Sequence, residues 1–178
     1  MIARRRLLLM VGGGAAAFLA VGLWPKSAAP ARASDVRAED IASVRVEKAA
    51  RRLMLLGHSG EALRTYDGIQ LGDAPVGHKQ FEGDERTPEG RYVIDYGNPD
   101  SAYHLSLHIS YPNAQDRAFA ESQGRSPGGD IFIHGQPNAL PIGRMAKDWT
   151  DGCIALSNQE IEELWSLIGD GTPIEIVN

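Results

Sequence analysis

Apolar residues recur at every second position, or in short continuous runs, along most of the chain, which is the pattern of β-strands with a buried face. Such segments occupy residues 44–48, 52–56, 62–66, 90–95, 103–110, 131–134 and 172–177. Turn-forming residues separate them at short intervals, as residues 57–60 (Gly-His-Ser-Gly) do between the second segment and the third. The pattern therefore predicts a mainly β fold.

Two segments follow helical periodicity instead. A short helix is expected over residues 114–122, and a second helix begins after Ser157, because Glu160 three residues later completes a capping box. The apolar residues of this second helix share one face and are Ile161, Leu164, Trp165 and Ile168. Gly169 and Gly171 are expected to end it. We interpret its apolar face as part of the core.

The first 33 residues differ from the rest of the chain. Three arginines at residues 4–6 precede an apolar run over residues 7–24 without an ionisable side chain, and residues 31–33 (Ala-Arg-Ala) offer the small residues that a signal peptidase requires. We therefore expect residues 1–33 to be an export signal or, if uncleaved, an N-terminal membrane anchor, since the run is about as long as the shortest membrane span. The arginines also suit a twin-arginine route.

Export sets the expected location and charge of the remaining chain. The protein is expected in the periplasm or cell envelope, with residues 34–43 as a polar lead-in and residues 44–178 as one domain large enough for a core. The leader holds five of the 18 basic residues and no acidic one, so 13 basic residues remain against 23 acidic ones, a net charge of −10. This charge argues against nucleic acid or anionic lipid as a partner. Membrane contact would come only through an uncleaved leader.

The five histidines raise the question of a metal site, and His104 and His108 have the i, i+4 spacing that zinc enzymes use on helices. Here the surrounding residues alternate, which places both histidines on one face of a strand over residues 103–110. At roughly 3.3 Å per residue they would stand about 13 Å apart. One zinc ion holds nitrogens at about 2 Å and therefore does not bind both. We expect no metal site.

The single cysteine, Cys153, is either a buried inert thiol or a nucleophile, since one cysteine cannot form an internal disulfide. A nucleophilic thiol needs an imidazole that takes its proton. His134 stands at the end of a short buried strand, about nineteen residues before Cys153. Gly152 allows a substrate to approach the backbone closely, and the N–H groups of Gly152 and Cys153 are candidate donors to an oxyanion.

This region resembles the catalytic signature of the L,D-transpeptidases of the YkuD-like type, which reads His-Gly, a loop, then Ser/Thr-His-Gly-Cys and an apolar residue. The chain has His134-Gly135 and, at residues 150–154, Thr-Asp-Gly-Cys-Ile. Residues 83–92 resemble a second recurrent block of the family, Gly-Asp-x-x-Thr-Pro-x-Gly. Further matches lie at residues 110–113 and 171–174, so that the resemblance covers residues 44–176.

The resemblance implies an L,D-transpeptidase-like β-sandwich or β-barrel with one or two short helices, formed by residues 44–178. It implies that Cys153 is the nucleophile, that His134 is its general base and that the carbonyl group of Gly135 orients the imidazole. Cys153 would expel the terminal D-Ala of a peptidoglycan stem peptide, and an amine of another stem would resolve the thioester. Carbapenem sensitivity is expected, and no cofactor is implied.

Two alternatives remain open at this stage. Water in place of the amine would make the protein a peptidoglycan hydrolase, acting as an L,D-carboxypeptidase, endopeptidase or amidase. A degenerate domain would bind peptidoglycan without catalysis. The retained Cys153, His134, Gly135 and Gly152 argue against the second alternative, because a pure binding domain has no use for a thiol.

The chain departs from the family signature at two positions. Asp151 stands where the family often has His, and we expect it to support Thr150 or a substrate amine, pointing away from the thiol or paired, because a nearby anion disfavours the thiolate. Ala155 stands where the family often has Arg. The cations that are candidates to replace that arginine in substrate binding are Arg144, Lys147 and Arg91, and His108 is a further candidate for substrate contact.

Overall fold

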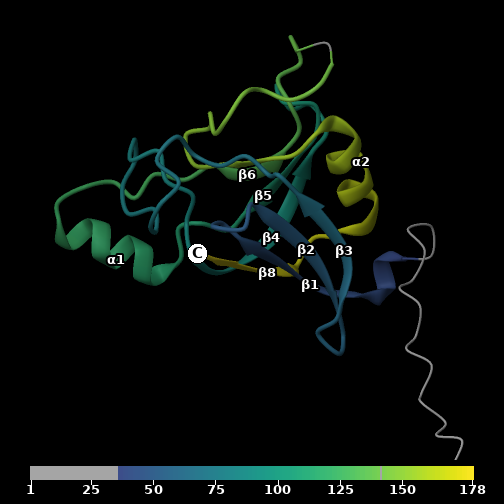
Figure 1. Ribbon diagram of the computed structural model, residues 1–178. Helices are drawn as coiled ribbons and strands as arrows, with labels where there is room; N and C mark the ends of the chain where they lie inside the picture. Colours follow the sequence, from purple (N-terminus) through teal and green to yellow (C-terminus); the bar gives the residue numbers. More distant parts are fainter. Residues whose placement is uncertain (1–35, 141) are drawn as a thin grey trace, which may run out of the picture. The chain divides into compact units, whose positions relative to one another are not determined.

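One sheet of eight strands organises the computed structural model, which describes residues 36–140 and 142–178 (Figure 1). The expected export signal, residues 1–33, lies outside the described residues. The strands are β1 (Ile41–Glu47), β2 (Arg52–Gly57), β3 (Ala62–Asp67), β4 (Gly90–Asn98), β5 (Ser106–Ile109), β6 (Ile131–His134), β7 (Ile154–Ala155) and β8 (Thr172–Val177). Their order across the sheet is β3-β2-β1-β8-β4-β5-β6-β7. The prediction of a mainly β fold is confirmed.

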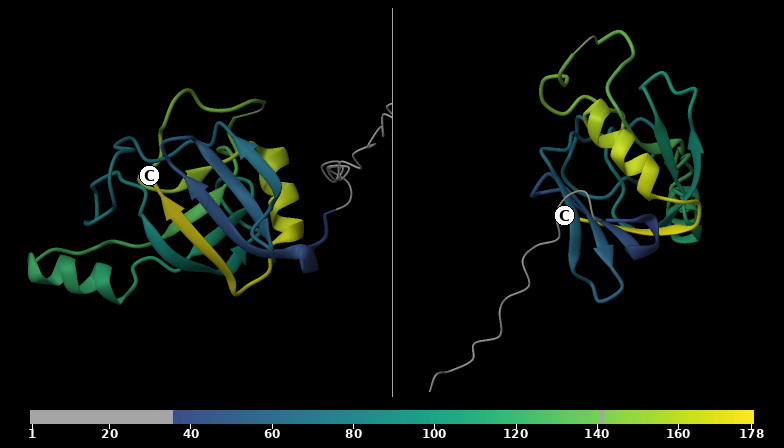
Figure 2. Two further views of the ribbon diagram at one scale, coloured as in Figure 1. Left: turned by 60° about the horizontal axis from the view of Figure 1, so that its bottom comes forward. Right: turned by 90° about the vertical axis from the view of Figure 1, so that its right-hand side faces the viewer.

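The sheet curls until its two ends meet. After β3 the chain returns to the opposite edge, where Gln70 forms an antiparallel bridge with Ala155 of β7 and Gly72 forms a parallel bridge with Thr150. The views of Figure 2 show the resulting twist of the strands. The β1–β8 and β6–β7 pairs are parallel, and the other strand pairs are antiparallel. The curl encloses the core and joins β7 to the segment that follows β3.

Two α-helices accompany the sheet, α1 (Ala114–Ser122) and α2 (Asn158–Leu167). Both lie where the sequence predicts them, and Ser157 and Glu160 form the expected capping box. The helix α2 packs on β5 and β6, with Ile161 and Leu164 fully buried. It ends before Ile168, whose extended backbone already leaves the helix one residue ahead of Gly169. Among the described residues, no helix has the length and apolar character needed to cross a membrane.

Several strand boundaries differ from the sequence expectation: β4 continues past residue 95 to Asn98, and β7 was not expected as a separate strand. β1 begins at Ile41, inside the segment expected as a polar lead-in, because its pairing with β2 continues past a bulge to Gly57. The strand expected over residues 103–110 is wrong at its start, since β5 covers only Ser106–Ile109. His104 adopts a φ of 70°, which turns the backbone out of the strand, so His104 and His108 do not share a strand face.

Lys48 is a buried cation at the end of β1. The alternation that buries Val44 and Val46 also turns Lys48 inward, and its side chain is 1% exposed. Its Nζ donates to the carbonyl groups of Gly77 and Thr87 at 2.6 and 2.9 Å, and pairs with Glu89 at 2.8 Å. Burial lowers the pKa of Lys48, and the ion pair with Glu89 opposes that shift. Lys48 therefore fixes the long connection between β3 and β4 to the sheet.

Candidate active site

A cavity of about 540 Å³ opens where β4, β5 and β6 meet the segment before β7. Both residues that the sequence singles out for chemistry, Cys153 and His134, line it. The other lining residues are Asn98, Ser101, Ala102, Tyr103, Ser106, Gly129, Asp130, Ile131, Phe132, Trp149, Thr150 and Asp151. The parallel pairing of β6 with β7, in which His134 faces Ala155, brings the histidine and the cysteine to this one place across the loop that separates them.

His134 is held in one orientation. Its ring is 3% exposed, and its Nδ1 lies 2.7 Å from the carbonyl oxygen of Gly135, as the sequence predicts. A carbonyl oxygen only accepts, so Nδ1 carries the proton and Nε2 keeps a free electron pair. Tyr103 stacks on the ring at 4.6 Å, and Trp149 meets it edge-on at 5.6 Å. Burial lowers the pKa of His134, and the Gly135 carbonyl group only partly opposes this, so the imidazole is a neutral base.

A tight turn presents Cys153. The Thr150 hydroxyl donates to the Cys153 carbonyl group at 2.8 Å and accepts from the Gly152 N–H at 3.3 Å. Gly152 has a φ of 129°, and a Cβ there would lie 2.6 Å from the backbone oxygen of Arg86. No other residue fits this position without moving the backbone. Thr150 and Gly152 therefore shape the turn that precedes the thiol.

Of the two N–H groups that the sequence offers to an oxyanion, those of Gly152 and Cys153, one has no recorded partner in the described part of the chain. Because the Gly152 N–H is bonded to Thr150, the sequence expectation that it serves an oxyanion is not favoured. The Cys153 N–H donates to no other group within the described part of the chain. It is consequently the donor that a tetrahedral intermediate on Cys153 would meet, as in oxyanion holes.

The Cys153 thiol rests in its protonated form. Its Sγ donates to the Asp130 carbonyl group at 3.6 Å and accepts from the Phe132 N–H at 3.4 Å. Although Cys153 reaches the cavity wall, burial of its thiol raises the pKa to about 11. The Phe132 N–H opposes that rise, while the negative charge of Asp151 adds to it. A nucleophilic role would therefore require the thiol to break its hydrogen bond to the Asp130 carbonyl group and pass its proton to an acceptor such as His134.

Asp151 is exposed at the cavity wall and makes no hydrogen bond within residues 36–140 and 142–178. It does not hold Thr150, whose hydroxyl is used inside the turn. Asp130 lines the same cavity, whereas no described lysine or arginine lines it. The cavity thus presents two carboxylates, which suits a cationic or neutral group better than an anionic one.

The cations considered as substitutes for the family arginine lie elsewhere. Arg144 pairs with Glu160 of α2 and bonds the Gly68 carbonyl group. Lys147 is exposed and lies outside the cavity lining. Arg91 pairs with Glu175 on β8 at 3.1 Å. None of the three lines the cysteine cavity, and the structure therefore does not bring them to the thiol.

His108 lies beside the cavity without lining it. Its Nδ1 is 2.6 Å from a carboxylate oxygen of Asp95, and its ring contacts Phe132, which does line the cavity. His104 is bonded to Glu162 of α2 instead. Among the described residues, no group of three or more His, Cys, Asp or Glu is arranged to hold a metal ion.

Sequence reasoning missed the aromatic wall of the cavity. Tyr103, Trp149 and Phe132 all line it, and the first two contact the His134 ring. The position of Trp149 directly before the Thr150 turn was an available signal. Tyr103 lies in the loop before β5 and offered none, because a strand was expected there.

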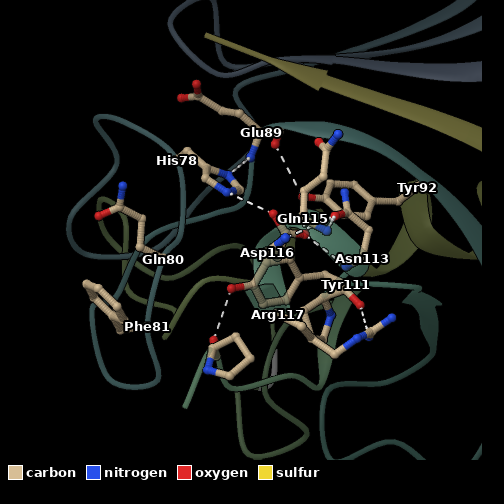
Figure 3. Close-up of polar contacts among 12 residues, drawn as sticks. His78, Gln80, Phe81, Glu89, Tyr92, Tyr111, Asn113, Gln115, Asp116 and Arg117 are labelled. Atoms are coloured by element: carbon tan, nitrogen blue, oxygen red, sulfur yellow. Dashed lines mark hydrogen bonds and ion pairs between the residues drawn. The ribbon is translucent and has the colours of Figure 1, made fainter. Parts of the chain in front are cut away.

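A polar hub centred on Asp116 lies outside the cavity lining (Figure 3). Asp116 of α1 accepts from His78 Nε2 at 3.0 Å, from the Tyr92 hydroxyl at 3.0 Å and from the Asn113 N–H at 2.9 Å. Since His78 Nδ1 accepts from the Glu89 N–H at 2.9 Å, Nε2 carries the ring proton. The hub ties α1 and β4 to the connection that contains the second family-like block, residues 83–92.

That connection packs directly against the cysteine turn. The Thr87 hydroxyl is fully buried and accepts from the Gly72 N–H at 3.2 Å. A Cβ on Gly72 would lie 2.1 Å from the Glu85 carbonyl oxygen and 3.1 Å from the Gly152 Cα. The close approach of these backbones connects residues 83–92 to the cysteine turn, although none of them lines the cavity.

Comparisons with known proteins bear on the family and the fold of the chain. The model of the L,D-transpeptidase catalytic domain, YkuD, matches residues 42–176. The putative L,D-transpeptidase YafK of Escherichia coli K12 is 30% identical over 129 residues, which are 70% of this chain and 46% of YafK. The chain thus spans about half the length of this curated relative.

Two solved structures are similar as well. The helical cell shape determining protein Pgp2 from Campylobacter jejuni has a TM-score of 0.62 and 29% identity, over 76% of this chain and 47% of Pgp2. Bd1075 from Bdellovibrio bacteriovorus has a TM-score of 0.54 and 25% identity, over 80% of this chain and 50% of Bd1075. In both cases about half of the other protein has a counterpart here.

Proposed function

The chain belongs to the L,D-transpeptidase catalytic domain family, and on that premise we propose that it acts on peptidoglycan stem peptides through a thioester on Cys153. The observation that carries this proposal is the shared cavity of Cys153 and His134, with the proton of His134 Nδ1 held by the Gly135 carbonyl group. The arrangement matches a nucleophile, its base and an orienting acceptor. The activity is proposed for the periplasm or cell envelope, after export through residues 1–33.

The first half-reaction forms the thioester. His134 Nε2 takes the proton of the Cys153 thiol as sulfur attacks the carbonyl carbon that joins an L-configured centre to the terminal D-residue. The oxygen of the tetrahedral intermediate accepts from the Cys153 N–H. His134 then returns the proton to the departing nitrogen, so that D-Ala leaves as a neutral amine and an acyl-enzyme remains.

The second half-reaction releases the acyl group. An amine of another stem attacks the thioester, His134 takes the excess proton of that amine, and the thiol is restored by the same proton. Asp151 and Asp130 line the cavity and attract a cationic amine before it loses its proton. This electrostatic preference supports transfer over hydrolysis as the main reaction, and it gives Asp151 a role in binding the acceptor.

The electrostatics of the resting site favour proton transfer during the attack over transfer before it. Burial holds the thiol at a pKa of about 11 and lowers the pKa of His134, so both groups are neutral at pH 7. A resting thiolate–imidazolium pair is therefore not expected. Proton transfer accompanies the attack, in the manner of general-base catalysis.

Incubation of the purified protein with intact sacculi tests the function. New crosslinked muropeptides that disappear in Cys153→Ser are expected. Shortened stems without crosslinks would identify hydrolysis from the same acyl-enzyme. Unchanged muropeptides, together with no carbapenem adduct on Cys153 in folded protein, would reduce the domain to a peptidoglycan-binding role.

A further inference from the structure

Strands β4, β5 and β6 carry two neighbouring rows of side chains on the face that bears the cavity. In the first row, Asn98 of β4 pairs with Ser106 of β5, and Ser106 pairs with His134 of β6. All three residues line the cysteine cavity. This row therefore belongs to the site already described.

The second row lies two residues further along each strand. Here Tyr96 pairs with His108, and His108 pairs with Phe132. The Phe132 N–H donates to Cys153 Sγ at 3.4 Å, so the row runs directly up to the nucleophile. A register shift between Ile94 and Tyr96 marks a bulge in β4, which turns Tyr96 outward.

The three side chains of this second row form a continuous aromatic strip. The Tyr96 and His108 rings stack at 4.5 Å with an angle of 17° between their planes. The His108 and Phe132 rings meet edge-on at 4.9 Å. Phe132 forms part of the cavity wall, whereas Tyr96 is 43% exposed. The strip thus leads from the cavity to the surface and leaves one large ring open to solvent.

The charges around the aromatic strip restrict what it binds. Asp95 holds His108 Nδ1 at 2.6 Å, and the carboxylate of Asp130 lies at the cavity end. Arg91, further along β4, is paired with Glu175. Lys79, whose charge reaches Cys153, is 3% exposed and paired with Asp84, so an anionic ligand would meet these carboxylates without a free counter-charge. A neutral ring with an apolar C–H face and hydroxyl groups at its edge fits this strip. The flat aromatic rings pack against its C–H face, and the carboxylates accept hydrogen bonds from its hydroxyl groups.

We propose that the aromatic strip binds a sugar ring of the glycan strand that carries the reacting stem peptide. The proposal rests on the proposed function, since it assigns the strip to the same substrate. Its occupant is a sugar, because the C–H face of a sugar ring packs on the exposed Tyr96 ring while its hydroxyl groups donate to the neighbouring Asp95 carboxylate. The continuity from Cys153 through Phe132 and His108 to Tyr96 gives the glycan a defined path away from the thiol.

A binding experiment tests the strip without turnover. The probe is the neutral tetramer of N-acetylglucosamine, titrated into full-length Cys153→Ala protein and followed by NMR chemical shifts. Adding Tyr96→Ala should raise the Kd about fivefold, the value of one good aromatic contact. Tyr96→Phe keeps the ring and should bind as the parent does. Phe119→Ala is the matched control, since Phe119 is also 43% exposed but lies on α1.

A negative result in the binding experiment and a negative result in an activity assay lead to different conclusions. No binding by the Cys153→Ala protein, or equal binding by the Tyr96→Ala variant, overturns the inference. With active enzyme, Tyr96→Ala should raise KM about fivefold for a disaccharide-linked tetrapeptide and leave KM for the free tetrapeptide unchanged. Equal effects on both substrates would also overturn it. If wild-type protein processes neither substrate, the proposed function fails, and the sugar titration still decides the binding proposal.

Discussion

The Nδ1 atom of His134 lies 2.7 Å from the carbonyl oxygen of Gly135, the residue that follows it in the chain. This short contact decides which ring nitrogen is a base, because the proton on Nδ1 leaves Nε2 unprotonated. It also makes the backbone of Gly135 part of the proposed machinery, although Gly135 contributes no side chain.

Gly135→Ala should impair catalysis more than folding. A Cβ there would lie 2.7 Å from the Asn158 side chain and 3.0 Å from the Tyr103 carbonyl oxygen, which forces the Gly135 backbone to shift. We expect kcat/KM to fall by at least about tenfold through misorientation of the imidazole. Gly169→Ala is the control, because its Cβ would meet no atom within 4 Å. Unaltered kinetics in a folded Gly135→Ala variant would contradict the role of this carbonyl group.

Gly152→Ala should destabilise the cysteine turn. Its φ of 129° and a 2.6 Å contact with the Arg86 oxygen combine strain and collision. Gly171→Ala separates the two effects, since Gly171 has a φ of 92° in open space. In urea unfolding we expect a loss of about 1 kcal/mol for Gly171→Ala and about 3 kcal/mol or more for Gly152→Ala. Equal losses would mean that the backbone contact is unimportant.

Asp151→Asn should make the thiol easier to ionise. The negative charge of Asp151 contributes to the raised pKa of Cys153, so its removal lowers that pKa and increases the thiolate fraction at any pH below about 11. The rate of iodoacetamide alkylation at pH 8 should rise about threefold. Asp170→Asn is the control, because Asp170 is exposed and follows α2 in the chain. It should leave the alkylation rate unchanged. A slower alkylation rate in Asp151→Asn would contradict the expectation that Asp151 raises the pKa of the thiol.

Asp116→Asn should weaken the polar hub. Asp116 is 8% exposed and accepts from His78, Tyr92 and Asn113. An asparagine amide keeps the volume of the carboxylate but places an N–H donor opposite groups that also donate. We therefore expect the free energy of unfolding to fall by about 2 kcal/mol. Glu121→Gln, at an exposed position of the same helix, is the matched control. Identical urea midpoints for the two variants would rule out a stabilising hub.

Periodicity predicted the elements well because it depends on local burial. Helix α1 and the cap of α2 lie at the predicted residues, since Ser157 and Glu160 act within one turn. Strand β5 was predicted too long, because the alternation in sequence continues through residues 103–105 while the left-handed backbone of His104 ends the pairing. Alternation describes side chains and does not reveal a turn that depends on one backbone angle.

The site residues that belong to one sequence motif were predictable, whereas contacts between segments far apart in the sequence were not. Cys153 and His134 stood out by residue type, and β6–β7 pairing brings them to one cavity. Buried Lys48 and Asp116 were missed, because their partners lie in other segments of the chain. The cations Arg144 and Arg91 were candidates to replace the family arginine, whereas the structure pairs them with Glu160 and Glu175.

The acyl-enzyme on Cys153 is the central claim, and intact-mass spectrometry tests it most directly. Protein mixed with a donor tetrapeptide and quenched in acid within seconds should gain the mass of the tetrapeptide less that of free D-Ala. Peptide mapping should locate this mass on Cys153, and Cys153→Ala should show none of it. Folded wild-type protein that turns over the tetrapeptide without any such adduct, or with an adduct on another residue, would contradict the account.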